Sequence, residues 1–145
     1  IIQKWIRVKQ IKYCRIKKMT KKIVLGDPII IDGRKLSLSR AVKAGDYIFC
    51  TGQVPMKDGK VMITGTIEEQ TIAVIQDIEK TLSLADCTLN DVVKSMVWLS
   101  NKKDFPGFNE VYSRYFKSDP PARSAVVNEL LVDVKVEIEV IAYKP

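Results

Sequence analysis

Residues suited to a buried face recur at helical spacing in the middle of the chain. Over residues 67–85 they follow one another at intervals of four, three, four and three, the pattern of an amphipathic helix: Thr71, Ile75, Ile78, Leu82 and Ala85. Thr66-Ile67-Glu68-Glu69 precedes them and matches a capping box, in which the Thr66 and Glu69 side chains each accept from the other residue's backbone N–H. We therefore predict a helix over residues 67–85 with Thr66 as its N-cap.

A second amphipathic helix is predicted over residues 104–117. Its apolar residues, mostly aromatic, also recur at helical spacing: Phe105, Phe108, Val111, Tyr112, Tyr115 and Phe116. Asp104 precedes them and is the expected N-cap. Because only Arg114 and Lys117 are basic in this segment, we interpret the stripe as core and not as a platform on which nucleic-acid bases stack.

Alternating or β-branched segments predict strands on both sides of the helices. Gly26, Pro28 and Gly33 bound a short first strand and a turn. Gly45-Asp46 is the expected turn of a hairpin. Beyond the first strand, we predict strands over residues 36–44 and 47–51 in this hairpin, 92–99 between the helices, and 122–130 and 134–143 after them.

The predicted order of elements is three strands, a helix, a strand, a helix and two strands. This order is typical of an α+β sandwich, in which a mixed sheet carries both helices on one face. Two helices leave the other face of the sheet uncovered, and another copy of the chain is the simplest cover. We therefore expect one domain that assembles as a homo-oligomer.

Charge divides the chain into two unequal parts. The 145 residues carry a formal net charge of +7, from 24 Lys and Arg against 17 Asp and Glu. Nine basic residues and no acidic residue lie in the first 22 positions, which leaves 15 basic and 17 acidic residues, a net charge of −2, for the rest. We predict a basic extension over residues 1–21 and a domain over residues 22–145. The extension has three open interpretations: a targeting segment, sequence upstream of a start at Met19, or a contact for nucleic acid or membrane.

The chain contains no histidine, which excludes a Ser-His-Asp triad, a Cys-His dyad, a His general base and an H-E-x-x-H zinc site. Cys14, Cys50 and Cys87 are odd in number and widely spaced, so that neither a disulfide framework nor a zinc site is indicated. We interpret Cys50 and Cys87 as small core residues and not as nucleophiles.

A reducing compartment fits best with this use of cysteine. We expect a cytoplasmic protein, or an organellar one if residues 1–21 are a targeting segment. No apolar run approaches the roughly 20 residues that span a bilayer.

Arg123 is the first candidate for chemistry. Pro120 and Pro121 fix the backbone just before Ala122-Arg123, where a strand is predicted to begin. An Arg on rigid backbone can offer two parallel N–H donors to a planar carboxylate, which a flexible Lys cannot. The alternative is an ordinary surface Arg in an ion pair.

Glu137 is the second candidate. It shares one face of the last strand with Glu139, about 7 Å away along the strand. A carboxylate among aliphatic residues can have a raised pKa and can orient or deprotonate a water molecule. The alternative is a solvated strand face that carries two Glu residues without a chemical role.

A series of short motifs runs through the domain in a fixed order. They are Lys43-Ala44-Gly45-Asp46, Thr51-Gly52-Gln53-Val54-Pro55, Glu68-Glu69-Gln70-Thr71, Asp91-Val92-Val93-Lys94, Phe108-Asn109-Glu110-Val111-Tyr112, Pro121-Ala122-Arg123-Ser124-Ala125 and Val136-Glu137-Ile138-Glu139. Together they resemble the Rid family of reactive-intermediate (enamine/imine) deaminases, also called YjgF-like proteins and labelled endoribonuclease L-PSP. The resemblance covers about residue 22 to the C-terminus and does not include the basic extension.

The resemblance implies a chorismate-mutase-like fold and a homotrimer, with the sheets facing a central barrel and three clefts between subunits. It implies that Arg123 clamps the carboxylate of 2-aminoacrylate or a related imino acid. It further implies that Glu137 positions or activates the water that attacks the C=N carbon, while the Gly52 backbone lies near the substrate and Asn109 supports the site. The implied products are a 2-oxo acid and ammonia, and no metal or cofactor is implied.

Three more positions complete the expected substrate site: Leu38, Thr51 and Ala125. Leu38 stands where the deaminase subgroup usually has a site tyrosine, and Ala125 stands where many members have Cys. Two other functions stay open, an RNA-acting protein of the kind the older label names and a non-catalytic, carboxylate-binding or chaperone-like trimer. The net charge of −2 over the domain argues against RNA, because phosphate contacts need a basic surface.

Overall fold

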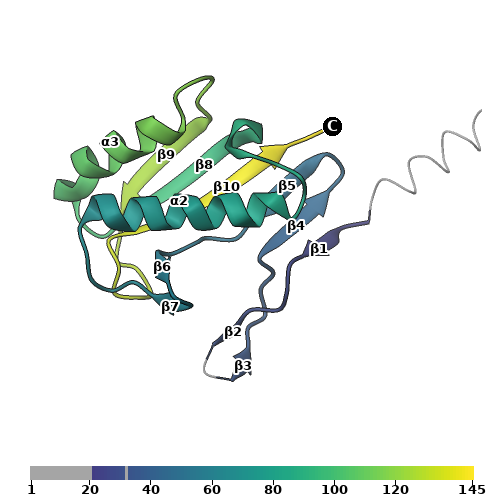
Figure 1. Cartoon of the computed structure of the whole chain (residues 1–145), viewed down its shortest axis with the longest axis horizontal. Coiled ribbons are helices and arrows are strands. Elements are labelled where there is room, and N and C mark those ends of the chain that lie inside the picture. The colour runs from purple at the N-terminus through teal and green to yellow at the C-terminus, as the bar shows by residue number, and fades with distance from the viewer. Residues whose placement is uncertain (1–20, 32) are drawn as a thin grey trace, which may run out of the picture.

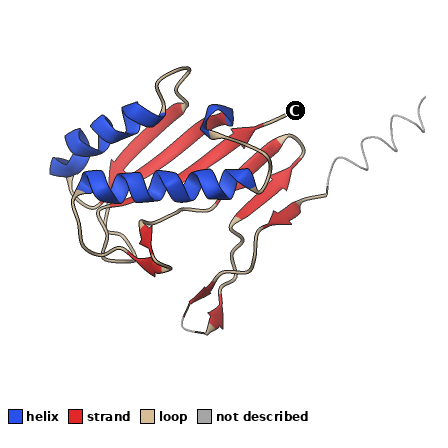
Figure 2. Ribbon diagram, in the orientation of Figure 1, coloured by secondary structure: helices blue, strands red, loops and turns tan. Residues whose placement is uncertain are grey.

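A six-stranded sheet with two helices on one face forms the fold, as predicted (Figures 1 and 2). The structure is a computed structural model that describes residues 21–31 and 33–145, so the basic extension up to residue 20 lies outside it. Strands β8 and β9 pair in parallel and the other neighbours in the sheet pair antiparallel. In spatial order the strands are β1 (Ile23–Leu25), β4 (Ala41–Ala44), β5 (Tyr47–Cys50), β10 (Val136–Tyr143), β8 (Val92–Leu99) and β9 (Ala122–Val127).

The strand prediction over residues 36–44 is wrong in its first half. Strand β4 begins only at Ala41, where its pairing with β5 begins at Cys50. Upstream, the Leu36 N–H donates to the Ile29 carbonyl at 2.9 Å. This bond extends a separate small hairpin of β2 (Ile30–Ile31) and β3 (Arg34–Lys35), which projects from the body of the domain (Figure 1).

The last two strands are shorter than predicted because their shared partner is short. Strand β8 ends at Leu99, which pairs with Val127 of β9 on one side and with Val136 of β10 on the other. Strand β9 therefore ends at Val127 and not at residue 130, and β10 begins at Val136 and not at residue 134. A second small hairpin, β6 (Met56–Lys57) with β7 (Lys60–Val61), was not predicted.

Helix α2 (Ile67–Ser83) begins as the capping box predicts. The Thr66 N–H donates to Glu69 Oε2 at 2.8 Å, and the Glu69 N–H donates to Thr66 Oγ1 at 3.2 Å. The helix ends two residues before the predicted boundary. A short 3₁₀ turn, η1 (Leu89–Asp91), then leads into β8.

Helix α3 (Phe105–Tyr115) begins differently from the prediction. Asp104 holds the N-cap position, but its side chain makes no capping hydrogen bond. A 3₁₀ turn, η2 (Lys102–Asp104), runs directly into the helix, and the first cap is Asn101, whose side-chain oxygen accepts from the Lys103 N–H at 2.9 Å. Asp104 is thus the N-cap residue, as predicted, but it does not cap with its side chain, because the turn before it already has a helical backbone.

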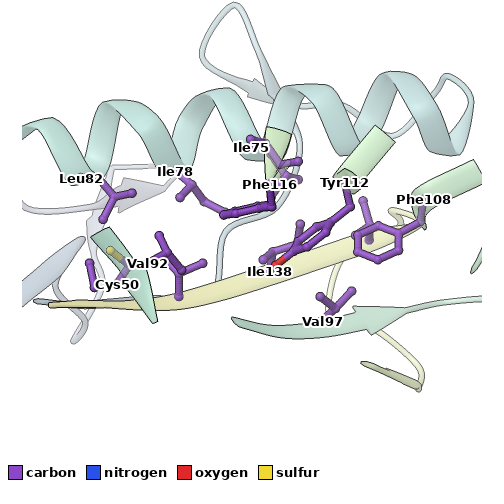
Figure 3. Packing of buried hydrophobic residues seen from close by; sticks show 14 of the residues in the cluster. Cys50, Ile75, Ile78, Leu82, Val92, Val97, Phe108, Tyr112, Phe116 and Ile138 are labelled. Atoms are coloured by element: carbon purple, nitrogen blue, oxygen red, sulfur yellow. The ribbon is translucent and has the colours of Figure 1, made fainter. Parts of the chain in front are cut away.

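The core lies between the helices and the sheet (Figure 3). Figure 3 shows Ile75, Ile78 and Leu82 of α2 above Val92 and Ile138 of the sheet, with the ring of Tyr112 pointing from α3 toward β10. Most of the aromatic stripe of α3 is buried there, which confirms its interpretation as core. Phe105 is the exception, with 40% of its surface exposed.

The other face of the sheet carries no helix and is rich in exposed apolar side chains. They are Val24, Tyr47, Phe49, Val126 and Tyr143. Pairing across the strands places them on the side opposite the buried core. In the described part of the chain, no helix combines the length and the apolar character that a membrane span requires.

Candidate active site

Arg123 lies at the edge of the sheet, on the side of the helices. It is the second residue of β9 and pairs directly with Ser95 of β8, which is fully buried beneath the helices. Its guanidinium carbon stands over three rings of α3, at 4.6 Å from the ring centre of Tyr112, 5.4 Å from Phe108 and 5.9 Å from Phe105. The Arg123 Nη2 donates to Asn109 Oδ1 at 2.9 Å. A strand and a helix thus hold this cation from two sides.

Arg123 forms no ion pair with any carboxylate in the described part of the chain. Among residues 21–31 and 33–145, the ion pairs involve Arg40, Lys80, Arg114 and Lys144, and none includes Arg123. The alternative of an ordinary ion-paired surface Arg therefore does not hold for the described residues. A half-buried guanidinium whose neighbours are an amide oxygen and aromatic faces retains free N–H donors for an external anion.

Glu137 lies on β10, on the face of the sheet that no helix covers. Its neighbours Val136 and Ile138 point into the core, and Glu137 pairs with Trp98 of β8. Partial burial, together with the negative charge of Glu139, raises the pKa of the Glu137 carboxyl above its ordinary value. A carboxyl with a raised pKa is better matched to proton transfer near neutral pH than an ordinary glutamate.

Gly52 packs directly against the Glu137 carboxylate. A Cβ at Gly52 would overlap Glu137 Oε1, so any residue other than glycine would move the carboxylate from its present place. The backbone pairing of Gln53 with Ile138 holds Gly52 close to Glu137. Gln53 and Ile138 exchange two backbone hydrogen bonds, of 2.9 and 3.0 Å. The structure therefore brings together two of the predicted site residues that are far apart in sequence.

Arg123 and Glu137 lie on opposite faces of the sheet. Arg123 pairs with Ser95, and Ser95 pairs with Val140 of β10, whose side chain is buried in the core. Glu137 stands three residues from Val140 along the same strand, about 10 Å away, and side chains alternate between the two faces. The predicted residues thus form two clusters in one chain: Arg123 with Asn109, and Glu137 with Gly52.

Of the other predicted site residues, Ala125 shares the face of Arg123 and Thr51 adjoins Gly52, whereas Leu38 is not brought to either cluster. Ala125 pairs with the buried Val97 and so lies on the Arg123 face of β9. Thr51 is half-buried next to Gly52, and its N–H donates to the Arg40 carbonyl at 3.1 Å. Leu38 stands in the loop before β4 with 43% of its surface exposed.

Neither described cysteine is prepared for nucleophilic chemistry. Burial raises the pKa of the Cys50 thiol to about 12, with a smaller contribution from Cys87. Burial, followed by the charge of Asp91, also raises the pKa of Cys87. Since the thiolate is the reactive form, their interpretation as core residues is supported by the structure.

The aromatic support of Arg123 was not predicted as part of the site. Phe105, Phe108 and Tyr112 were expected only as core, because their spacing is equally that of an apolar helix face. One sequence signal was available. Asn109 interrupts this apolar stripe with a polar side chain next to Phe108, which marks the border where the helix meets a polar partner.

Comparisons with known proteins agree with this fold and with these motifs. A model of the family described as Endoribonuclease L-PSP matches residues 35–144. A RutC family protein of Saccharolobus solfataricus is 49% identical over 108 residues, which cover 73% of this chain and 86% of the relative. Protein MMF1, mitochondrial, of Saccharomyces cerevisiae is 36% identical over 107 residues, covering 73% of this chain and 74% of the relative.

A solved structure with a similar fold is that of YyfA from Yersinia pestis, described as a protein of unknown function of the conserved Rid protein family. It matches with a TM-score of 0.77 and 31% identity, and the match covers 85% of this chain and 99% of YyfA. The chain belongs to the Rid family, the group also described as YjgF-like or endoribonuclease L-PSP proteins.

Proposed function

We propose that this protein is an enamine/imine deaminase that hydrolyses 2-aminoacrylate-type intermediates to 2-oxo acids and ammonia. In the imine tautomer, the oxygen of water bonds to the C=N carbon and gives a carbinolamine. The C–N bond then breaks, the hydroxyl proton leaves as the carbonyl forms, and the nitrogen departs as ammonia. The overall reaction adds one water to the imine and neither oxidises nor reduces the substrate.

The observation that carries this proposal is that Arg123 makes no ion pair among the described residues. Its guanidinium is oriented by Asn109 and by the rings of α3, and it lacks an acidic partner among the described residues. An orientated guanidinium with free N–H groups matches a planar carboxylate, which every 2-imino acid carries next to the reacting carbon. Arg123 would therefore hold the substrate by the end that does not react.

Glu137 supplies the acid–base chemistry in this proposal. Its raised pKa suits a group that accepts a proton from the attacking water and returns one to the departing nitrogen. Gly52 has no Cβ, so the Glu137 carboxylate can lie directly against its backbone. A positioned carboxylate of this kind contributes about 10²–10⁴-fold to a rate.

The two clusters support a site built between copies of the chain. Arg123 and Glu137 cannot meet on one substrate within a single chain, because the sheet separates them. The exposed apolar face around Glu137 offers a surface that a second copy can cover. We therefore include in the proposal a homotrimer in which Arg123 of one subunit and Glu137 of another enclose the substrate.

An RNA-acting protein is the second candidate, since the family description names an endoribonuclease. Apart from the first 22 residues, the chain carries a net charge of −2, and the described cation beside aromatic rings, Arg123, is enclosed by α3. These observations favour a small carboxylate over a phosphate backbone, whose binding rests on many cationic contacts. A non-catalytic carboxylate-binding trimer shares the Arg123 cluster and differs only in the role of Glu137.

The location of the protein depends on its basic extension. Three relatives from two yeasts carry the word mitochondrial in their names, which accords with the targeting interpretation of residues 1–21. We propose that the protein is organellar if residues 1–21 direct it to an organelle, and cytoplasmic if they do not. A fluorescent protein fused behind residues 1–21, compared with the same fusion lacking them, decides between the two.

The proposal is tested by following 2-oxo acid formation while a lyase or an amino-acid oxidase releases an imine into solution. Wild type should exceed the spontaneous hydrolysis rate, and Arg123→Ala should lose that gain. Arg114→Ala is the matched control, because Arg114 is an exposed Arg of α3 that pairs with Glu110 away from the site. Arg123→Lys keeps the charge and loses the two parallel donors, so it should remain well below wild type.

The same proteins separate the other candidates. Binding of 2-oxobutyrate without any acceleration of imine hydrolysis would replace the deaminase by the non-catalytic binder. Cleavage of RNA by a chain that begins at Met19, unaffected by Arg123→Ala, would replace it by the RNA-acting protein.

A further inference from the structure

Tyr112 stands between Arg123 and the core of the protein. Its ring centre is 4.6 Å from the guanidinium carbon of Arg123, nearer than either of the other two rings around that group. On the core side, Tyr112 stacks on Phe116 at 4.4 Å with an interplanar angle of 26° and contacts Phe108 at 5.3 Å. The Tyr112 ring therefore packs against other aromatic rings on one side and meets Arg123 on the other.

Arg123 has few other restraints on its orientation. Its side chain makes one hydrogen bond within the described part of the chain, from Nη2 to Asn109 Oδ1. One bond at one nitrogen leaves the guanidinium free to turn about that contact. A ring held against the group removes this freedom, because the cation is attracted to the face of the ring.

The hydroxyl of Tyr112 has no part in this support. It is buried and has no hydrogen-bond partner among residues 21–31 and 33–145, and neither has the hydroxyl of Ser95, the cross-strand neighbour of Arg123. Burial raises the pKa of Tyr112, and the smaller opposing effects of Ser95 and Arg123 indicate that both lie near its oxygen. The group that holds the guanidinium is the ring, which phenylalanine also possesses.

We propose that Tyr112 is the positioning residue of the carboxylate-binding site: its ring fixes the guanidinium plane of Arg123, so that the free N–H edge faces the substrate. This inference rests on the proposed function, which gives Arg123 its carboxylate. Tyr112 touches neither the substrate nor the reacting carbon and acts through Arg123 alone.

The test compares Tyr112→Phe, Tyr112→Leu and Phe116→Leu in the full chain. Phe116→Leu is the matched control, since it removes a buried ring of α3 that contacts Tyr112 but not Arg123. Calorimetric titration with 2-oxobutyrate should give an affinity about tenfold weaker for Tyr112→Leu and within about twofold of wild type for the other two. In the imine assay, Tyr112→Leu should raise KM while kcat stays within about twofold.

A second measurement does not depend on the ligand. In NMR spectra, the Nε–H signal of Arg123 should be displaced by the aromatic ring in wild type and in Tyr112→Phe, and should move toward the free-arginine position in Tyr112→Leu. If wild type binds no 2-oxo acid, the proposed function fails, while this signal still decides whether Tyr112 holds Arg123. The inference is overturned if Tyr112→Leu leaves affinity and signal unchanged, or if Phe116→Leu weakens binding equally. Tyr112→Met replaces Tyr112→Leu if the latter does not fold.

Discussion

Arg123 and Glu137 lie on opposite faces of the same sheet, Arg123 beside α3 and Glu137 on the face that no helix covers. In the proposed function, one chain therefore presents its anion-binding group on one side of the sheet and its acid–base group on the other. Each group is prepared locally: Arg123 by Asn109 and aromatic rings, Glu137 by Gly52 and partial burial. A site completed by a second copy of the chain explains this arrangement, because Arg123 of one copy can then face Glu137 of another.

Glu137 is expected to lower stability as the pH rises. Its folded pKa is above its unfolded value of about 4.3, so the folded chain binds more protons between these two values. Stability should therefore fall as the pH rises through this window, and Glu137→Gln should lack that fall and be the more stable protein at neutral pH. Urea unfolding at fixed protein concentration between pH 4 and 8 measures the difference.

Glu139→Gln provides the control for this prediction. It removes the neighbouring negative charge that contributes to the raised pKa of Glu137. The pH range over which stability falls should therefore become narrower, but it should not disappear, because burial is the larger cause of the raised pKa. Equal pH dependence in wild type and Glu137→Gln would show that Glu137 is not the group responsible.

Gly52→Ala should displace the Glu137 carboxylate. The added Cβ would overlap Glu137 Oε1, and because this oxygen ends a flexible side chain it can move aside, so we expect a loss of at most about 1 kcal/mol in stability. Thermal unfolding should show this loss, and the imine assay should show a lower rate. In a Gly52→Ala, Glu137→Ala double variant the overlap is gone, so its stability should exceed the sum of the single effects. Strict additivity would contradict the contact.

Asn109→Asp should weaken the binding of an external carboxylate to Arg123. An aspartate of nearly the same shape would place a carboxylate against Arg123 Nη2, where the amide oxygen now stands at 2.9 Å. We expect a gain of about 1 kcal/mol in stability and an affinity for 2-oxobutyrate at least about tenfold weaker. Asn90→Asp, an exposed change of the same charge, is the control. Unchanged affinity in Asn109→Asp would remove Arg123 from the binding site.

Cys50 should resist alkylation in the folded protein. With a pKa of about 12, roughly one Cys50 thiol in ten thousand is ionised at pH 8. Treatment with iodoacetamide, followed by peptide mass spectrometry, should find Cys50 and Cys87 unmodified in the native protein and modified in urea. Rapid native labelling of Cys50 would show that a thiolate is accessible and would reopen a nucleophilic role.

Local signals in the sequence predicted the local structure well. The capping box at Thr66 determined where α2 begins, and the Gly45-Asp46 turn determined the pairing of β4 with β5. The hairpin of β6 and β7 was missed although Asp58-Gly59 carries its signal, two residues that both adopt positive φ (49° and 76°) as two-residue hairpin turns require. Asp104 is the predicted N-cap residue of α3, but its side chain makes no capping hydrogen bond, because sequence spacing does not reveal a 3₁₀ turn ahead of a helix.

The geometry of the candidate site depends on relationships that no local pattern contains. Gly52 and Glu137 meet because Gln53 pairs with Ile138, a contact between segments 85 positions apart. Which face Arg123 occupies is set by the register of β9 against β8, and a shift of one residue would turn it to the other side. Motif resemblance could name these residues, but only the paired strands divide them between two faces.

The most direct test mixes two inactive proteins. Arg123→Ala and Glu137→Gln subunits, co-expressed in equal amounts so that they assemble together, are assayed for imine hydrolysis beside each variant alone. If Arg123 of one subunit works with Glu137 of another, about a quarter of the sites in the mixture contain both groups, and about a quarter of wild-type activity should return. If the mixture stays as inactive as its components although mixed oligomers form, a site shared between subunits is contradicted.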